Sequence, residues 1–574
     1  MNRCWQMYKQ AVGPLPNKIL SWPFFGAGLD NVGVDGQPVE EPMPTCGPDE
    51  ILVRVDALGL CASDAKMVRM GRDYPLFFER DFAANPARLG HEAALTVVAV
   101  GEEWRTQHYP GQRLGIQPDV YMHGKREIFG VNILGAMAQY VTLDRRVLAS
   151  DVGSCVFPVV SDVSYADIAV LEPWACVDVA YSSSARRLSP KQGGVLWIKG
   201  RPGDMRPYKI SYLLENKHIV LTDVPPSLAG QICCRFSGVV ERNRATAADL
   251  VAEFAPKTGL DDIILIEPFK ARDVAEAVDS LASHGTLNLV TNHPLDDSVA
   301  VDMSKLHYQH LALLGCTGPD LAEAYGVERN RSELRPGGVA WVMGAGGTMG
   351  RMHIQRALQM PGGPRAIIAT NRGQERLNNI INDFSGLAAA NGRELVALSP
   401  KLEPDRLQYE VDRLTGGRGC DDIVVIVPNP AAVTEALPFL ATDGMLVIFA
   451  GVQAGNQIKL PLDWVPIHGA QFTGTSGSTV ADQLRVLEKI QNNTLSAAQT
   501  VAAIGGMTAM SNGLQAVLEQ TYPGKIVIFP QLTDLPLVSL PELEQALPDV
   551  YRQLGPGPTW TAQAERVLIE QCWQ

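Results

Sequence analysis

The chain has 574 residues, a length typical of about four domains. Its 49 Lys and Arg against 62 Asp and Glu give a net charge of −13, and this acidic balance disfavours a nucleic-acid-binding protein. Ten cysteines without a Cys-x-x-Cys pair argue against a disulfide scaffold and fit a cytoplasmic protein, and no apolar run is long enough to predict a membrane span or a secretory signal.

The first 185 residues are predicted to be rich in β-strands. Strand-like alternation recurs at 51–55, 93–101, 111–116 and 136–143, and glycine and proline fill the segments between. This pattern indicates a partly open β-barrel rather than a parallel sheet.

This β-rich region also contains residue types that bind zinc. Cys61 follows a predicted strand, His91 and Glu92 come thirty residues later, and Glu172 lies eighty residues beyond them. A thiolate, an imidazole and a carboxylate can bind zinc tetrahedrally and leave one position for water or substrate. Each residue alone is equally compatible with a buried thiol, a core histidine or a helix-end carboxylate, but the ordered combination favours a metal site.

From about residue 190 the pattern changes to short apolar strands alternating with helix-length segments, which predicts doubly wound parallel sheets. This part contains an internal repeat. GGVLWIKG at 193–200 matches GGVAWVMG at 337–344, and DDIILIEP at 261–268 matches DDIVVIVP at 421–428. Three later glycines correspond as well, 159 residues apart, namely Gly285, Gly315 and Gly318 with Gly444, Gly474 and Gly477. General similarity among such sheets is the alternative, but matches in the same order along both segments favour a duplicated domain.

In the second copy, a glycine-rich turn at 344–350 joins a predicted buried strand to a predicted helix. Glycines in this context let backbone N–H groups approach a pyrophosphate at the positive end of a helix. The turn is one residue longer than a strict G-x-G-x-x-G, and the alternative is a tight turn without a ligand. We expect it to bind a dinucleotide through Gly344, Gly346, Gly347, Thr348, Met349 and Gly350.

The next predicted strand of this copy ends at Asn371 and Arg372. NAD enzymes place an acidic residue there for the ribose 2′-hydroxyl, whereas Arg372 is suited to a 2′-phosphate. The sequence therefore favours NADP(H) over NAD(H), the alternative being an exposed arginine without a ligand.

The first copy has a different turn at 200–206. Pro202 removes a backbone donor and Asp204 would repel a pyrophosphate. We expect this copy to have lost dinucleotide binding and to serve packing, assembly or enclosure of the substrate.

Several motifs together resemble the zinc-dependent medium-chain dehydrogenases/reductases, and within them the branch of sorbitol and threonine dehydrogenases and L-sorbose-1-phosphate reductase-like enzymes. They are GLCASD around Cys61, GHE at 90–92, GAMAQY at 135–140, LEPWAC at 171–176, the glycine turn at 344–350 and PGKIVIFP at 523–530. The resemblance covers 1–185 and about 336–535. The extra copy is a departure, since the family normally has one.

The resemblance implies a fold of class α/β plus β: a GroES-like β-barrel catalytic domain with two tandem Rossmann-like doubly wound parallel-sheet domains, the first degenerate, and an active site in the cleft between the catalytic and nucleotide domains. The expected boundaries are 1–188 for the catalytic domain, 189–333 and 334–483 for the two Rossmann-like domains, and 484–574 for a segment that returns to the catalytic domain and ends in a tail.

The resemblance also implies roles for single residues. Cys61 and His91 would surround one catalytic zinc with Glu92 or Glu172, and Ser63 would pass the substrate proton outward. Lys66 stands where relatives often have a relay histidine. Many relatives hold a second, structural zinc with clustered cysteines after the GHE motif, but 93–154 contains no cysteine, so we expect no structural zinc.

The function that the resemblance implies is a cytoplasmic, homo-oligomeric, zinc-dependent oxidoreductase that transfers hydride between NAD(P)(H) and a polyol, a ketose or a sugar phosphate. Four cations are candidates to contact a substrate phosphate: Lys66, Arg69, Arg72 and Lys125. Two alternatives stay open, a zinc-independent reductase of the quinone-reductase type and a non-catalytic scaffold built from a duplicated dehydrogenase.

Overall fold

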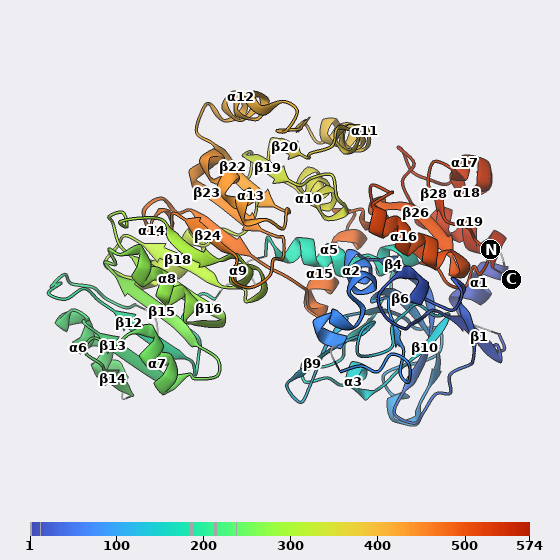
Figure 1. The fold of residues 1–574 in the computed structure, drawn as a ribbon, viewed down its shortest axis with the longest axis horizontal. Coiled ribbons are helices and arrows are strands. Elements are labelled where there is room, and N and C mark those ends of the chain that lie inside the picture. Colours follow the sequence, from blue (N-terminus) through green and yellow to red (C-terminus); the bar gives the residue numbers. More distant parts are fainter. Residues whose placement is uncertain are drawn as a thin grey trace. The chain divides into compact units, whose positions relative to one another are not determined.

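The computed structural model describes residues 3–11, 13–77, 79–182, 187–211, 215–236 and 238–573. The chain divides into two compact units, Met1–Ala175 with Ser478–Gln574, and Cys176–Gly477. In Figure 1 the first unit takes the blue and red ends of the colour scale and the second takes green to orange. Across the described residues, every helix is too short or too polar to cross a bilayer.

The first unit is built on an eight-stranded sheet whose strands come from both ends of the chain. Strand β10 pairs with β4. Three strands from beyond residue 500 extend the sheet from β4, and the first of them, β27, pairs with β4 directly. The strand order is β11 (Val156–Pro158), β7 (Arg113–Ile116), β6 (Glu92–Val100), β4 (Ile51–Leu60), β27 (Lys525–Phe529), β26 (Val501–Gly506) and β28 (Val538–Ser539), with β10 (Tyr140–Leu143) beside β4.

The strand expected at 136–143 begins only at Tyr140, because the residues before it pack against the backbone of Leu89 and Gly90. A Cβ on Gly135 would collide with the carbonyl oxygen of Leu89 and lie 2.5 Å from that of Gly90. The segment thus runs directly against the backbone that leads to His91. Ala136 donates its N–H to the Gly90 carbonyl at 2.8 Å and fixes this approach.

Short elements surround this sheet. The two-stranded pairs are β1 (Lys18–Ser21) with β3 (Val39–Pro42), β2 (Pro23–Phe24) with β5 (Ala87–Arg88), and β8 (Asp119–Met122) with β9 (Lys125–Ile128). The α-helices are α1 (Arg3–Lys9), α2 (Ala62–Met70), α3 (Arg145–Leu148), α4 (Tyr165–Ala169), α5 (Leu171–Val179, which runs into the second unit), α15 (Val480–Gln491), α16 (Met510–Glu519), α17 (Leu543–Ala546), α18 (Pro548–Tyr551) and α19 (Ala562–Cys572).

The C-terminal tail is anchored by one buried side chain. Glu565, on α19, accepts the backbone N–H groups of Tyr165 and Ala166 at 2.6 and 2.9 Å. These two groups lie in the first turn of α4, whose N–H groups have no partner within the helix. The tail therefore supplies the helix with acceptors.

The second unit contains two six-stranded parallel sheets with the same strand order, which confirms the predicted fold class. The first is β14 (Val239–Glu241), β13 (His218–Thr222), β12 (Val195–Lys199), β15 (Leu260–Ile266), β16 (Leu281–Val290) and β18 (Ala312–Cys316). The second is β21 (Glu394–Leu398), β20 (Ala366–Thr370), β19 (Val339–Met343), β22 (Cys420–Val425), β23 (Leu440–Ile448) and β25 (Gln471–Gly474). They are the green and the yellow-to-orange sheets of Figure 1.

The two sheets agree down to single hydrogen bonds. Trp197 donates its indole N–H to the Thr222 hydroxyl at 3.1 Å, and the repeat-related Trp341 donates to Thr370 at 2.8 Å. Removing one partner of such a pair would leave a buried polar group without a hydrogen bond, which costs stability. Both copies contain both partners.

The copies differ after their first strand. In the second copy β19 leads into α10 (Thr348–Gln359), whereas the described residues between β12 and β13 form no helix. The remaining helices of the unit are α6 (Pro226–Arg235), α7 (Ala247–Phe254), α8 (Ala271–Asp279) and α9 (Met303–Tyr308) in the first copy, and α11 (Gln374–Ala390), α12 (Pro404–Thr415), α13 (Pro430–Ala436) and α14 (Trp464–His468) in the second. One strand from each copy, β17 (Val299–Asp302) and β24 (Gln457–Leu460), forms a separate antiparallel pair.

Candidate metal centre and dinucleotide site

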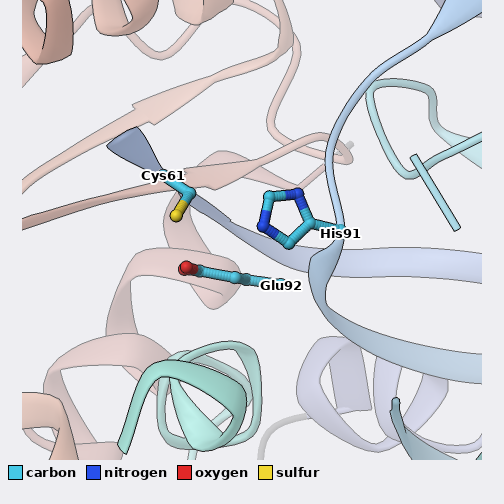
Figure 2. A group of neighbouring side chains, drawn as sticks. All are labelled: Cys61, His91 and Glu92. Carbon is cyan, nitrogen blue, oxygen red and sulfur yellow. The ribbon is translucent and has the colours of Figure 1, made fainter. Parts of the chain in front are cut away.

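Three side chains of the first unit converge on one point. Cys61 follows β4, His91 immediately precedes β6 and Glu92 begins β6, and the neighbouring strands β4 and β6 bring them together. One ligand atom from each residue lies within 4.8 Å of the other two. Figure 2 shows the sulfur, one ring nitrogen and the carboxylate turned toward one another. His91 and Glu92 are buried, whereas Cys61 is partly exposed. Solvent can therefore reach the group mainly beside Cys61.

The carboxylate of Asp64 contacts the segments that carry Cys61 and His91. Asp64 lies in the first turn of α2, where its carboxylate accepts the backbone N–H of Cys61 at 3.0 Å and that of Gly90 at 3.3 Å. The same carboxylate lies 3.4 Å from Nδ1 of His91. Burial alone would lower the pKa of His91, but Asp64 raises it well above its ordinary value. One buried carboxylate therefore orients the thiol segment and the imidazole together.

Glu92 is paired with a buried cation. Lys525, on β27, donates to both carboxylate oxygens of Glu92, at 2.6 and 2.7 Å. Burial alone would lower the pKa of Lys525, but the charges of Glu92, Cys61 and Glu172 raise it above its usual value. Glycine is required at position 59, because a Cβ there would lie 2.5 Å from an oxygen of Glu92.

The other predicted residues of this site lie at different distances from the group. The Ser63 hydroxyl is 3.1 Å from Nε2 of His91, so it is in direct contact. Glu172, at the start of α5, is not one of the three converging residues, although its charge acts on Lys525. Lys66 is exposed, and its ammonium lies 5.9 Å from the centre of the Tyr74 ring.

The donor set fits zinc. A thiolate, an imidazole and a carboxylate are the ligands that zinc takes in open, catalytic sites. Their ligand atoms lie within 4.8 Å of one another, so side-chain shifts of about 1 Å would bring all three to about 2 Å from a common ion. Asp64 supplies the supporting carboxylate that metal-bound imidazoles usually have.

In the second unit, the glycine turn of the second copy has the geometry expected for dinucleotide binding. Gly344 has a φ of +86°, which favours glycine, and a Cβ on Gly350 would lie 2.7 Å from the Gly344 carbonyl oxygen. Gly347 is the N-cap of α10, and a Cβ on it would meet no atom within 4 Å. Thr348 and Met349 form the first turn of α10, at the helix end whose N–H groups point toward anionic ligands in dinucleotide-binding folds.

A cleft of about 920 Å³ lies beside this turn, at the carboxyl ends of the strands, where parallel α/β sheets bind their ligands. Gly344, Asn371 and Arg372, three residues predicted to bind the dinucleotide, line this cleft. Two further cations, Arg376 and Lys401, also line it.

The matching position in the first copy is filled by the protein's own ion pairs. Arg206, the counterpart of Gly350, donates to the Asp204 carboxylate at 2.8 Å and to that of Glu267 at 2.6 Å. The Tyr208 hydroxyl also contacts Asp204, at 3.2 Å. A cleft of about 310 Å³ remains there, a third of the volume found in the second copy.

Comparisons with known proteins show which proteins this chain is similar to in sequence and in fold. Residues 47–151 match the alcohol dehydrogenase GroES-like domain. L-sorbose 1-phosphate reductase of Klebsiella pneumoniae is 23% identical over 547 residues, covering 92% of this chain and 93% of that protein. Mannitol-1-phosphate 5-dehydrogenase of Aliivibrio fischeri is 26% identical over 254 residues, covering 42% of this chain and 59% of that protein. The solved structure of AibC has a TM-score of 0.50 at 14% identity, covering 92% of this chain and 98% of that one.

The chain is similar to the alcohol dehydrogenase-like medium-chain dehydrogenases/reductases, and residues 47–151 match their GroES-like domain. This similarity supports an oxidoreductase. The duplicated nucleotide domain sets it apart from the one-copy pattern that the resemblance predicts.

Sequence reasoning missed four residues of these sites, Asp64, Lys525, Arg376 and Lys401. Asp64 and Lys525 both lie inside motifs that the sequence analysis quoted, GLCASD and PGKIVIFP. The spacing of Asp64 three residues after the N-cap Cys61 is a capping-box signal that could have identified it. Arg376 follows Arg372 by four residues, in the first turn of α11, and its closeness in sequence could have suggested it.

Proposed function

We propose that the protein is a zinc-dependent oxidoreductase that interconverts a secondary alcohol and a ketone of a polyol, a ketose or a sugar phosphate, with NAD(P)(H) as the hydride carrier. The observation that carries the proposal is the convergence of the Cys61 thiol, the His91 ring and the Glu92 carboxylate within 4.8 Å. Neither a scaffold nor a zinc-free reductase requires these three donors to meet.

Cys61 and His91 would hold the zinc, with a carboxylate as third ligand. Glu92 is in reach, but both its oxygens accept from Lys525, so Glu172 is the alternative third ligand. When bound, zinc supplies a Lewis acid for the substrate oxygen, and the dinucleotide supplies the hydride acceptor or donor.

Ser63 would carry the substrate proton. Ser63 is half-buried and its hydroxyl is 3.1 Å from Nε2 of His91, so it is in reach of a metal ligand and still partly exposed. A hydroxyl can accept one proton while donating another, which suits a relay in either direction. Lys66, one turn further along α2, is exposed and would act only as the outer end of such a relay.

The second nucleotide-domain copy would bind the dinucleotide. Backbone N–H groups at Gly347, Thr348 and Met349 would receive the pyrophosphate. Arg372, with Arg376 and Lys401 in the same cleft, would favour the 2′-phosphate of NADP(H). The ion pairs of Arg206 leave one dinucleotide site per chain.

The similarity to L-sorbose 1-phosphate reductase and mannitol-1-phosphate 5-dehydrogenase makes a phosphorylated sugar or polyol the preferred substrate class. Among the candidate cations, Arg69 donates to the Leu518 carbonyl at 2.9 Å and Lys125 lies 3.9 Å from Glu127. The exposed Lys66 and Arg72 are therefore the better candidates for a phosphate contact.

The test combines metal analysis with turnover. We expect the purified full chain to contain one zinc and to oxidise NADPH with ketoses or their phosphates, with a lower KM for NADPH than for NADH. Cys61→Ser should lose zinc and turnover together, while Cys46→Ser, which replaces a thiol outside the metal group, should keep both. Turnover that persists in metal-free Cys61→Ser would support the zinc-independent reductase instead. Absence of both dinucleotide binding and turnover would support the scaffold.

A further inference from the structure

The two nucleotide-domain copies pack against each other about a local two-fold axis. Strands β17 and β24, one from each copy, pair antiparallel. Ala300 pairs with Lys459, which is its own counterpart at the 159-residue offset of the repeat. The flanking pairs exchange reciprocally: Val299 pairs with Leu460, the counterpart of Val301, and Val301 pairs with Ile458, the counterpart of Val299.

Close backbone contacts repeat the same symmetry. A Cβ on Gly474, at the end of β25, would lie 2.7 Å from the Leu306 carbonyl and 3.0 Å from the His307 nitrogen on α9. A Cβ on the counterpart glycine, Gly315 of β18, would lie 2.9 Å from Pro466, the counterpart of His307 on α14. Each copy thus presses its helix onto the edge strand of the other.

We infer that residues 195–316 act as a built-in two-fold partner of the dinucleotide-binding copy, so that one chain reproduces an interface that a homodimer would build from two. In a two-fold interface the same patch of each subunit faces its equivalent, and residue i contacts j where j contacts i. The contacts of β17, β24, α9 and α14 follow this rule within a single chain.

The interface has the character of an obligate one. Val299, Val301, Ile458 and Leu460 are all at most 3% exposed, and they belong to one hydrophobic core that continues through both sheets. Obligate interfaces are apolar in this way, like a domain core cut in two. The edge strands β18 and β25 lie close to each other without pairing, so each limits the access of a second chain to the other's edge. The homo-oligomer expected from the sequence would therefore have to form through another surface.

The same packing brings the first copy close to the place where the cofactor would bind in the second copy. The carboxyl ends of β23 and β25 belong to the second half of the Rossmann sheet, which binds the nicotinamide mononucleotide in dinucleotide-binding folds. Helix α9 of the first copy lies against these strands, and a Cβ on Gly451, just beyond β23, would collide with the Tyr308 hydroxyl. His307 is buried in the same contact, and burial lowers its pKa to about 4, so the ring is neutral.

The built-in partner thus has a task beyond packing. Through His307 and Tyr308 it positions the loop at Gly451, and this part of the inference rests on the proposed dinucleotide function. A first copy without its own cofactor would still determine the geometry of the site in the second copy.

The interface is tested by cysteine cross-linking, which needs no cofactor. Ala300 and Lys459 are exposed, and directly paired antiparallel residues are close enough for a disulfide. Ala300→Cys with Lys459→Cys should form an internal disulfide on oxidation, seen by peptide mapping, and the chain should remain one 62.1 kDa species on a non-reducing gel. Lys459→Cys alone is the matched control and should form no internal disulfide, because its exposed thiol then has no cysteine opposite it on β17. Failure of the double variant to form the internal disulfide, although both exposed thiols react with a thiol reagent, would overturn the inference.

The positioning role is tested with Tyr308→Ala. Tyr308 is 52% exposed, so its removal should leave folding and zinc content unchanged. We expect KM for NADPH to rise several-fold with kcat nearly constant, whereas Tyr409→Ala, which removes a 63% exposed tyrosine on α12 of the second copy, should change neither. An unchanged KM would refute the role of Tyr308. If the wild type binds no dinucleotide, the proposed function fails, but the cross-linking result still decides the interface.

Discussion

Lys525 donates to both oxygens of Glu92, and the two side chains are 4% and 0% exposed. They are 433 residues apart in sequence, so this pair joins the C-terminal part of the chain to the candidate metal centre. A buried carboxylate of this kind needs a partner, whether an ammonium or a metal ion.

Replacing Lys525 should therefore destabilise the fold strongly. In metal-free protein, we expect Lys525→Met to lower the free energy of unfolding by about 3–5 kcal/mol, because Glu92 keeps a buried charge without its partner. The double variant with Glu92→Met should regain most of this loss. Urea denaturation of the four proteins measures the coupling. A loss under about 1 kcal/mol, the value of an exposed ion pair, would contradict the buried pair.

Asp64 should control metal affinity without binding the metal. We expect Asp64→Asn to weaken zinc binding about 10- to 100-fold, since it weakens the carboxylate that orients the Cys61 segment and faces His91. Competition with a coloured chelator measures the affinity. Asp73→Asn, an exposed change just beyond α2, is the matched control and should keep wild-type affinity. Equal affinities of both variants would remove Asp64 from the support of the site.

Arg372 should decide between the two dinucleotides. We expect Arg372→Ala to raise KM for NADPH about tenfold, equivalent to about 1.4 kcal/mol, with little change for NADH, because only NADPH carries the 2′-phosphate. Arg418→Ala replaces an exposed arginine that does not line the cleft and serves as the control. A parallel rise for both dinucleotides would show that Arg372 does not read the 2′-phosphate.

Glu565 should make stability depend on pH. Burial raises the pKa of this carboxyl to about 7, whereas an unfolded glutamate titrates near about 4.3. The folded chain then binds the proton more tightly, so this contribution to stability is complete below about pH 4.3 and is lost as the pH rises through 7. We expect Glu565→Gln to remove a slope of at most about 1.4 kcal/mol per pH unit from the free energy of unfolding in this range. The exposed Glu544→Gln should leave the slope unchanged, and so would Glu565→Gln if the carboxyl were ionised throughout.

The fold could be predicted largely from local patterns. The apolar strands with their flanking glycines and aspartates marked both parallel sheets, because a buried parallel strand reads as a continuous apolar run. Cys61, His91 and Glu92 could be grouped because their order along the chain matches a family motif. The group itself depends on the register between β4 and β6, where Gly59 lies opposite Glu92.

What the sequence left hidden depends on long-range pairing. Lys525 was visible in a strand, but its partner follows only from the register of β27 against β4, where Ile526 lies opposite Leu60. The pairing of β17 with β24 was likewise inaccessible, since four-residue strands carry little pattern of their own. The third carboxylate was open between Glu92 and Glu172, and the structure places Glu92 in the group while pairing it with Lys525.

The indole-to-hydroxyl hydrogen bond of Trp341 and Thr370 recurs as Trp197 and Thr222 in a copy whose glycine turn has been replaced by ion pairs. Folding and ligand recognition are thus encoded by separate sets of residues within one architecture. A duplicated segment of this kind can give up its ligand and still persist, provided that its neighbour depends on its shape.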